Sequence, residues 1–280
     1  MKIIKKIDSF NPKDIFECGQ CFRWNKEDDG SYTGVFNGKI LNVCLKDGSI
    51  VFNGNATESE IENYFDLSRD YEKIKKELSK IDSYLEESIE YGSGIRILNQ
   101  DLFETIISFI ISANNNIPRI KGIIERICKN YGEEKSFEGR VYYTFPTPKE
   151  LSKASVEDFR KLGLGFRDVR VYETTKLINE GNFKLADLYN MKTEEASEKL
   201  LTLPGVGPKV CDCILLFSDL KRFDVFPIDV WVRRVMNDLY IKSEDESKVS
   251  KKEISKLAKE KFGNLEGIAQ QYLFYWRREA

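Results

Sequence analysis

The spacing of apolar residues divides the chain into a strand-like and a helical part. Between residues 21 and 53, short stretches rich in aromatic and β-branched side chains alternate with polar positions, as strands with one buried face do. The predicted strands are residues 21–25, 31–36, 39–45 and 49–53. Asp-Gly or Asn-Gly pairs separate the last three strands and follow the first, at 29–30, 37–38 and 47–48. These pairs supply the positive φ that tight hairpins need. We therefore predict an antiparallel sheet of about four strands.

Helical spacing begins after this sheet. Thr57 and Glu60 form a capping box that opens a helix through residue 65, and a charged helix is predicted at residues 71–90. After Gly94, strand character almost disappears and apolar residues recur every three or four positions. The helices predicted there are residues 102–111, 117–131, 156–162, 169–178, 194–201, 209–217, 230–239, 251–262 and 267–277. The polar stretch 242–252 is predicted to be a surface loop.

This order of elements predicts an α+β protein. A mixed N-terminal domain, residues 1–92, holds the antiparallel sheet with some helices, and a larger all-helical domain spans residues 93–280.

Composition narrows the chemistry. The 280 residues include 44 Lys and Arg against 46 Asp and Glu, a net charge of -2, so a nucleic-acid partner would require a local basic face. There is no histidine, which excludes Ser-His-Asp and Cys-His nucleophile systems and His-ligated zinc. No apolar run reaches membrane-span length and no secretory signal opens the chain, so we expect a cytoplasmic protein without a membrane partner.

The six cysteines are expected to be reduced thiols. Cys18 and Cys21 form one C-x-x-C pair, but no second pair completes a tetrahedral zinc site. We interpret both as packing residues and expect neither a metal nor a redox role for them.

The segment from Leu200 to Val210 has the most specific pattern in the chain. A predicted helix ends near Leu201, Gly205 and Gly207 permit a tight hairpin, and Pro208 suits the first turn of a new helix. A helix-hairpin-helix of this kind turns backbone N–H groups outward at a helix start, where they bind phosphate regardless of base sequence. We predict DNA phosphate contacts from the backbone of Gly205, Val206 and Gly207. The alternative is an ordinary interhelical turn with a glycine cap.

Lys209 and Asp229 are the candidate catalytic pair. Lys209 opens the helix after the hairpin, and Asp229 precedes the next predicted helix twenty residues later. If the two helix starts meet in one cleft, an amine nucleophile lies beside a carboxylate that stabilises positive charge. Asp229 is also a plausible N-cap, and the two roles are compatible. A lysine after such a hairpin also occurs in DNA-binding modules without catalysis, where it contacts phosphate.

These features together resemble the helix-hairpin-helix DNA glycosylases, and further segments resemble the 8-oxoguanine DNA glycosylase/AP lyase family. The segments are Gly19-Gln20-Cys21-Phe22-Arg23-Trp24, Ser112-Ala113-Asn114-Asn115-Asn116-Ile117-Pro118-Arg119, Gly163-Leu164-Gly165-Phe166-Arg167 and Ala269-Gln270-Gln271-Tyr272-Leu273-Phe274. They follow the family's order and cover nearly the whole chain. The resemblance implies a bifunctional enzyme that flips 8-oxoguanine out of duplex DNA, forms a Schiff base at Lys209 and cleaves the strand by β-elimination. It also implies that two subdomains of the helical part flank the active-site cleft.

The same resemblance assigns roles to further residues. The carbonyl of Gly19 accepts the N7 hydrogen that distinguishes 8-oxoguanine from guanine, Gln270 reads the Watson–Crick edge, and Cys213 and Phe274 sandwich the base. Asn114, Arg119 and Arg167 are expected to bind the opposite cytosine, and Phe166 to act as a wedge in the base stack. Without the family, Gly19 is better explained as a turn, Cys213 and Phe274 as core positions and Gln270 as a solvated residue. The alternative for the other positions is that residues 114–116 cap a helix and the arginines contact phosphate.

The resemblance implies few accessory groups. No cofactor is required, and the hairpin is expected to hold a monovalent cation on the carbonyls of Leu201, Leu203 and Val206. Trp231 stands where eukaryotic members carry histidine, and Phe166 where many members carry tyrosine.

Three alternatives to this family remain. The absence of any cysteine after Cys213 opposes an iron–sulfur enzyme of the endonuclease III type, and Lys209 opposes an alkylbase glycosylase. A non-catalytic DNA-binding protein remains the third alternative, and a monomer is expected.

Overall fold

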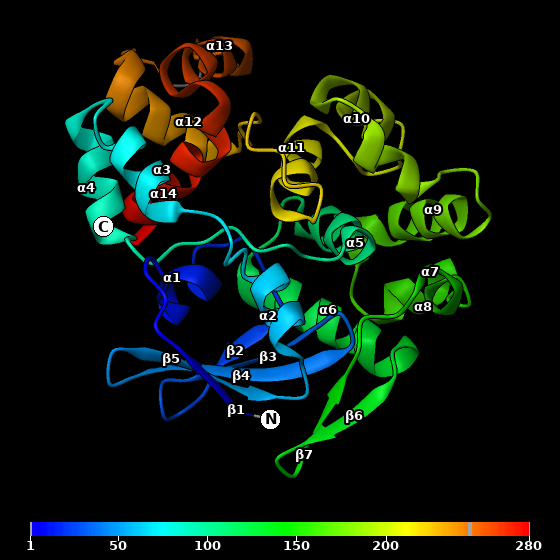
Figure 1. The fold of residues 1–280 in the computed structure, drawn as a ribbon. Coiled ribbons are helices and arrows are strands. Elements are labelled where there is room, and N and C mark those ends of the chain that lie inside the picture. Colours follow the sequence, from blue (N-terminus) through cyan, green and yellow to red (C-terminus); the bar gives the residue numbers. More distant parts are fainter. Residues whose placement is uncertain (1, 246–247, 280) are drawn as a thin grey trace.

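The computed structural model describes residues 2–245 and 248–279, with an antiparallel sheet at one end and helices above it (Figure 1). The sheet has the strand order β1-β5-β4-β3-β2. Its strands are β1 (Lys2–Lys5), β2 (Trp24–Lys26), β3 (Tyr32–Phe36), β4 (Lys39–Lys46) and β5 (Ser49–Gly54). The predicted antiparallel pairing is confirmed, and the hairpin residues Asn37, Gly38, Asp47 and Gly48 all have positive φ. The fifth strand, β1, was not predicted because its four residues are too few to show alternation.

A layer of aromatic side chains joins the sheet to the two helices that cover it. Trp24 stacks on Phe16 of α1 (Pro12–Glu17) with ring centroids 4.1 Å apart, and its indole N–H donates to the hydroxyl of Tyr64, 3.0 Å away, in α2 (Glu58–Tyr64). The capping box at Thr57 is present as predicted. Helix α1 ends at Glu17 with Cys18 as its C-cap, and Gly19 follows.

The predicted helix at residues 71–90 is wrong as a single element. It divides into α3 (Tyr71–Leu78) and α4 (Ser83–Tyr91), because the Asp82 carboxylate caps a new helix by accepting from the N–H of Leu85, 2.9 Å away. Helix α4 packs against the C-terminal helix α14 (Glu266–Glu279), α3 packs against α4, and apolar residues of both α3 and α4 belong to the core of the helical part (Figure 1). The proposed domain boundary near residue 92 stays a prediction.

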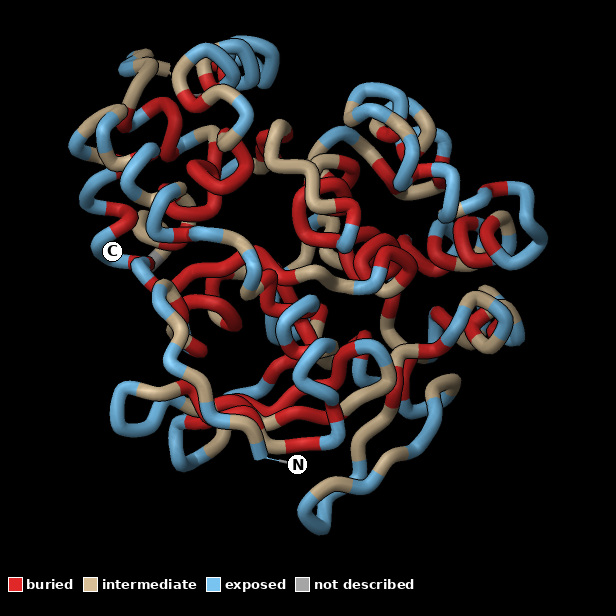
Figure 2. The backbone as a smooth tube through the Cα atoms, in the orientation of Figure 1, coloured by how far each residue is buried: buried red, intermediate tan, exposed pale blue. Residues whose placement is uncertain are grey.

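The remaining helices largely follow the prediction. They are α5 (Leu102–Ser112), α6 (Ile117–Tyr131), α7 (Pro148–Leu151), α8 (Val156–Lys161), α9 (Asp168–Asn179), α10 (Thr193–Leu200), α11 (Pro208–Phe217), α12 (Val230–Met236) and α13 (Lys251–Phe262). Helices α5 and α11 run through the middle of the molecule and are largely buried (Figure 2). The α+β class is confirmed. Among residues 2–245 and 248–279, no helix is long and apolar enough to cross a membrane.

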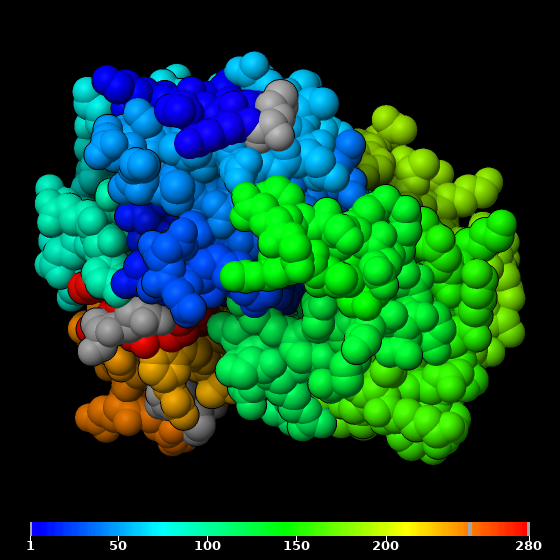
Figure 3. Space-filling view, turned by 90° about the horizontal axis from the view of Figure 1, so that it is seen from below, coloured from blue at the N-terminus to red at the C-terminus, as the bar shows by residue number. Residues whose placement is uncertain are grey.

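One hairpin contradicts the expectation that the second part lacks strands. β6 (Glu134–Phe137) and β7 (Arg140–Tyr143) pair through a turn in which Glu138 and Gly139 have positive φ. The two strands have four residues each, too few to show hydrophobic alternation, and the adjacent charges of Glu134 and Lys135 open the first of them. The hairpin lies against the sheet, where Arg140 pairs with Glu27 at 2.6 Å and Asn53 donates to Glu138 at 2.7 Å (Figure 3).

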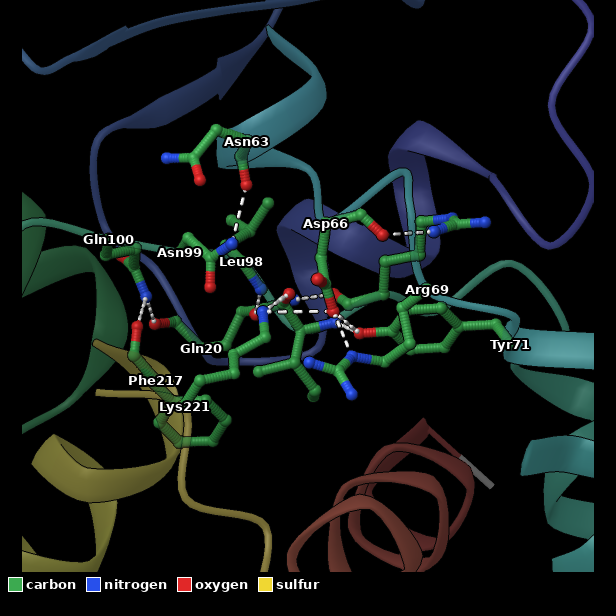
Figure 4. Close-up of polar contacts among 12 residues, drawn as sticks. Gln20, Asn63, Asp66, Arg69, Tyr71, Leu98, Asn99, Gln100, Phe217 and Lys221 are labelled. Carbon is green, nitrogen blue, oxygen red and sulfur yellow. Dashed lines mark hydrogen bonds and ion pairs between the residues drawn. The ribbon is translucent and has the colours of Figure 1, made fainter. Parts of the chain in front are cut away.

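A buried polar cluster joins the sheet layer to the helical layer behind the site (Figure 4). Lys221, in the segment after α11, donates to the carbonyl of Ile97 and lies 3.4 Å from a carboxylate oxygen of Asp66. The same oxygen accepts from Arg69 at 2.7 Å and from the hydroxyl of Tyr71 at 3.0 Å. Burial lowers the pKa of the Lys221 amine to about 7, against the opposing effect of Asp66.

Lys221 is expected to make stability depend on pH above neutrality. The unfolded chain keeps the amine protonated to pH 10 or so, whereas the folded chain releases the proton near pH 7. The free energy of unfolding therefore rises between these values, by up to about 1.4 kcal/mol per pH unit. Urea denaturation at pH 7 and pH 9 should show this rise in the wild type and a smaller one in Lys221→Met. If the free energy of unfolding changed equally with pH in the wild type and in Lys221→Met, Lys221 would be charged in the folded state at both pH values.

Candidate active site

A pocket of about 710 Å³ collects candidate residues from four distant parts of the chain. Lys209 stands at the start of α11, Asp229 immediately before α12, Gly19 after α1 and Phe274 on α14, and all four line the pocket. Asn114 and its neighbours in the α5–α6 turn form a further wall. The helix starts that carry Lys209 and Asp229 therefore meet at one pocket, as predicted.

The predicted hairpin joins α10 to α11. Gly205 has φ +86, and Gly207 is the N-cap of α11 with Pro208 in its first turn. The N–H of Val206 donates to the carbonyl of Leu203 at 3.0 Å, so it is engaged within the hairpin. The N–H groups of the first turn of α11 have no acceptor inside the helix, which leaves them for an external anion.

The two hairpin glycines are expected to respond differently to alanine. A Cβ at Gly205 would lie 3.0 Å from side-chain carbons of both Arg170 and Ile110 at a positive φ, so Gly205→Ala should lower the free energy of unfolding by about 1–3 kcal/mol. Gly207 has φ −97, and nothing lies within 4 Å of its added Cβ. Gly207→Ala should therefore change stability by less than about 1 kcal/mol.

Urea denaturation and DNA binding measured together separate the two effects. If backbone at Gly207 approaches a phosphate, Gly207→Ala weakens binding to any duplex while the protein stays stable. Unchanged affinity would place the phosphate elsewhere.

Asp229 has the cap geometry that its sequence position indicated. Its backbone is extended at φ −100, and its carboxylate accepts from the N–H of Val232 at 2.8 Å. Buried Ile228 precedes it and fixes the start of α12. One carboxylate oxygen of Asp229 therefore caps α12, while the residue also lines the pocket.

The proposed base-binding residues lie on the pocket wall and directly behind it. Gly19 has φ +89, which disfavours other residues, and a Cβ there would lie 3.2 Å from Nη1 of Arg278 and 3.4 Å from the Phe274 ring. Cys213 follows Lys209 by one helical turn and interacts with its amine, although burial raises the pKa of the Cys213 thiol to about 11. Gln270, one turn before Phe274, is buried, and its Oε1 has no hydrogen-bond partner in the described part of the chain. Cys213 and Gln270 do not themselves line the pocket.

The residues expected to contact the opposite base lie around the Asn114 turn. Asn114 is exposed with φ +51, and the Phe166 side chain is 55% exposed. Arg119 is exposed and approaches the Gly163 carbonyl at 3.4 Å. The exposed ring of Phe166 has the geometry that a wedge needs.

Arg167 is placed differently from its neighbours. Only 2% of it is exposed, and its guanidinium donates to the backbone carbonyls of Ala113, Asn114 and Leu164 while covering the Phe166 ring at 4.2 Å. Burial and the nearby Arg119 lower its pKa. In this conformation Arg167 holds the Asn114 turn, and it reaches a base only after giving up these contacts.

A basic rim was missed by the sequence analysis. Arg233, Arg234, Lys251 and Arg278 also line the pocket. Their signal was weak because a net charge of -2 hides a local cluster and the four residues come from three helices. They supply the local positive charge that a phosphate-binding face needs.

The described residues offer no side-chain metal site. No group of three or more His, Cys, Asp or Glu side chains within residues 2–245 and 248–279 is arranged to hold an ion. Cys18 and Cys21 are free and buried, and burial raises the pKa of the Cys18 thiol to about 12, in agreement with the expected packing role.

Comparisons with known proteins cover the chain almost end to end. Residues 2–106 match the model of the 8-oxoguanine DNA glycosylase N-terminal domain, and residues 107–262 match the HhH-GPD superfamily of base excision DNA repair proteins. A probable N-glycosylase/DNA lyase of Methanothermobacter thermautotrophicus is 32% identical over 79% of this chain and 75% of its own length.

Solved structures agree with this match. The 8-oxoguanine glycosylase/lyase of Clostridium acetobutylicum in its apo form is 42% identical with a TM-score of 0.92, covering 98% of this chain and 96% of that chain. Its complex with double-stranded DNA containing cytosine opposite 8-oxoguanine has the same identity and TM-score and covers 100% of this chain and 98% of that one.

Proposed function

Because the chain belongs to the 8-oxoguanine DNA glycosylase/lyase family within the HhH-GPD superfamily, we propose that it excises 8-oxoguanine paired with cytosine and cleaves the strand at the resulting site. The observation that carries this proposal is the presence of Lys209, Asp229, Gly19 and Phe274 around one pocket. No histidine or metal cluster is needed for the chemistry that these residues provide.

Lys209 and Asp229 have different roles in the reaction: Lys209 is the nucleophile, and Asp229 stabilises positive charge. Once a nucleotide is flipped into the pocket, the neutral amine of Lys209 attacks C1′ of the sugar while the bond to the base breaks and its electron pair leaves with the base. Positive charge develops on the sugar, and the carboxylate of Asp229 stabilises it. Opening of the sugar ring gives a Schiff base at Lys209, and loss of a C2′ proton then expels the 3′ phosphate by β-elimination.

The pocket walls provide selectivity. The Gly19 carbonyl accepts a hydrogen bond from N7–H, which 8-oxoguanine has and guanine lacks. Phe274 on the wall, and Cys213 beside Lys209, would enclose the base, and the unpartnered Oε1 of Gln270, which lies one turn before Phe274, would meet the Watson–Crick edge. A buried polar atom without a partner is costly, so a base that satisfies it gains affinity over one that does not.

Residues at the edge of the pocket and beyond it would bind the rest of the duplex. Phe166 replaces the flipped base in the stack, while Asn114, Arg119 and a released Arg167 bind the remaining cytosine. The hairpin backbone binds phosphate, and the carbonyls of Leu201, Leu203 and Val206 would hold a monovalent cation. The Leu203 carbonyl accepts from the N–H of Val206 at 3.0 Å and keeps a second lone pair that such a cation could use.

Borohydride trapping tests the proposal directly. The protein is incubated with duplexes that carry 8-oxoguanine opposite cytosine, 8-oxoguanine opposite adenine, or guanine opposite cytosine, and borohydride reduces any Schiff base to a stable adduct. We expect an adduct chiefly with the first duplex. Release of the base without an adduct would indicate a glycosylase that lacks the lyase step, and binding with neither result would indicate a non-catalytic DNA-binding protein.

A further inference from the structure

The backbone on each side of Gly19 is held by a buried or partly buried glutamine. Nε2 of Gln271, on α14, donates to the carbonyl of Cys18 at 2.6 Å. Nε2 of Gln100, in the segment before α5, donates to the carbonyl of Gln20 at 2.8 Å. Both acceptors belong to peptide groups that flank the Gly19 carbonyl. Neither Gln100 nor Gln271 lines the pocket.

The side chain of Gln20 makes further hydrogen bonds that restrain the backbone of this turn (Figure 4). It is fully buried, and its Nε2 donates to the carbonyls of Ile15 at 2.9 Å and Arg96 at 2.8 Å. Its Oε1 accepts from the N–H of Leu98 at 2.8 Å. Glycine at φ +89 has wide conformational freedom on its own, so these bonds are what fix the direction of the Gly19 carbonyl.

The same glutamines connect Gly19 to the other walls of the pocket. Gln100 also donates to the carbonyl of Phe217 at 2.9 Å, and Phe217 is the last residue of the helix that Lys209 opens. The carbonyl of Gln100 accepts from the N–H of Asp219 at 2.8 Å. Gln271 lies between Gln270 and Phe274 on α14. The glutamine frame, Gln20, Gln100 and Gln271, therefore joins the turn that carries Gly19 to helices α11 and α14.

We propose that Gln100 and Gln271 are positioning residues for base discrimination, which hold the Gly19 carbonyl at hydrogen-bonding distance from N7 of the flipped base. This inference rests on the proposed function. Guanine and 8-oxoguanine differ at N7 by a single hydrogen, so selectivity requires a carbonyl that neither retreats nor turns. A displacement of about 1 Å takes the acceptor out of hydrogen-bonding range.

Two activities of the same protein separate positioning from general stability. Excision of 8-oxoguanine requires the Gly19 carbonyl, whereas cleavage at a preformed abasic site requires Lys209 but no base. We expect Gln271→Met and Gln100→Met each to slow single-turnover excision about tenfold relative to the lyase rate on the abasic duplex. Because both activities scale with the amount of folded protein, their ratio is independent of partial unfolding.

Tyr64→Phe is the matched control. It removes a buried hydrogen bond of 3.0 Å, donated by the Trp24 indole, that involves neither residues 18–20 nor the side chains of Gln100 and Gln271. Its excision-to-lyase ratio should equal that of the wild type. An unchanged ratio in both glutamine variants would overturn the inference, and so would an equal change in Tyr64→Phe. Absence of 8-oxoguanine excision by the wild type would instead refute the proposed function.

Discussion

Lys209→Gln is expected to abolish borohydride trapping and to slow release of 8-oxoguanine by about 10³-fold or more. Glutamine has a similar length but no nucleophilic amine, so no Schiff base forms. The variant should still bind the lesion duplex, because the hairpin backbone, the Asn114 turn and the Gly19 wall are untouched. Gel analysis of the reduced reaction and single-turnover kinetics measure the two quantities.

Lys251→Gln provides the control for charge. Lys251 lines the same pocket, so its replacement removes one positive charge from the site without removing the proposed nucleophile. This variant should keep the trapped adduct, and its only defect should be weaker binding to any duplex, with a smaller dependence of that binding on salt concentration. An adduct that survives in Lys209→Gln, or disappears in Lys251→Gln, would move the nucleophile to another residue.

The sequence correctly predicted turns and helix caps, because these are formed by residues that are close together in the chain. The Asn37-Gly38 and Asp47-Gly48 pairs, the capping box at Thr57 and the cap at Asp229 need only neighbouring residues, and all have the expected geometry. Strand β1 was missed because its four residues are too few to show alternation and its pairing with β5 is a long-range contact. The β6–β7 hairpin was missed because its strands, of four residues each, are too short to show hydrophobic alternation.

The site could be predicted only in part for the same reason. The hairpin glycines and Lys209 are adjacent in sequence, so their relation follows from spacing. The approach of Gly19 to Phe274 joins residues at opposite ends of the chain, and only the resemblance to a family indicated it. The inward, backbone-bound position of Arg167 had no sequence signal, because an arginine after an exposed phenylalanine is usually solvated.

Asp229→Asn is expected to lower the rate of base excision about 10²–10³-fold without destabilising the protein. Asparagine caps a helix as well as aspartate does, so the bond to the N–H of Val232 is kept, but the negative charge that stabilises the sugar cation is lost. Asp229→Ala loses both and should also lower the free energy of unfolding by about 1 kcal/mol. Urea denaturation and single-turnover excision of the two variants distinguish the roles. If Asp229→Asn excises at the wild-type rate, Asp229 serves α12 alone, and the cation is stabilised by another group in the pocket.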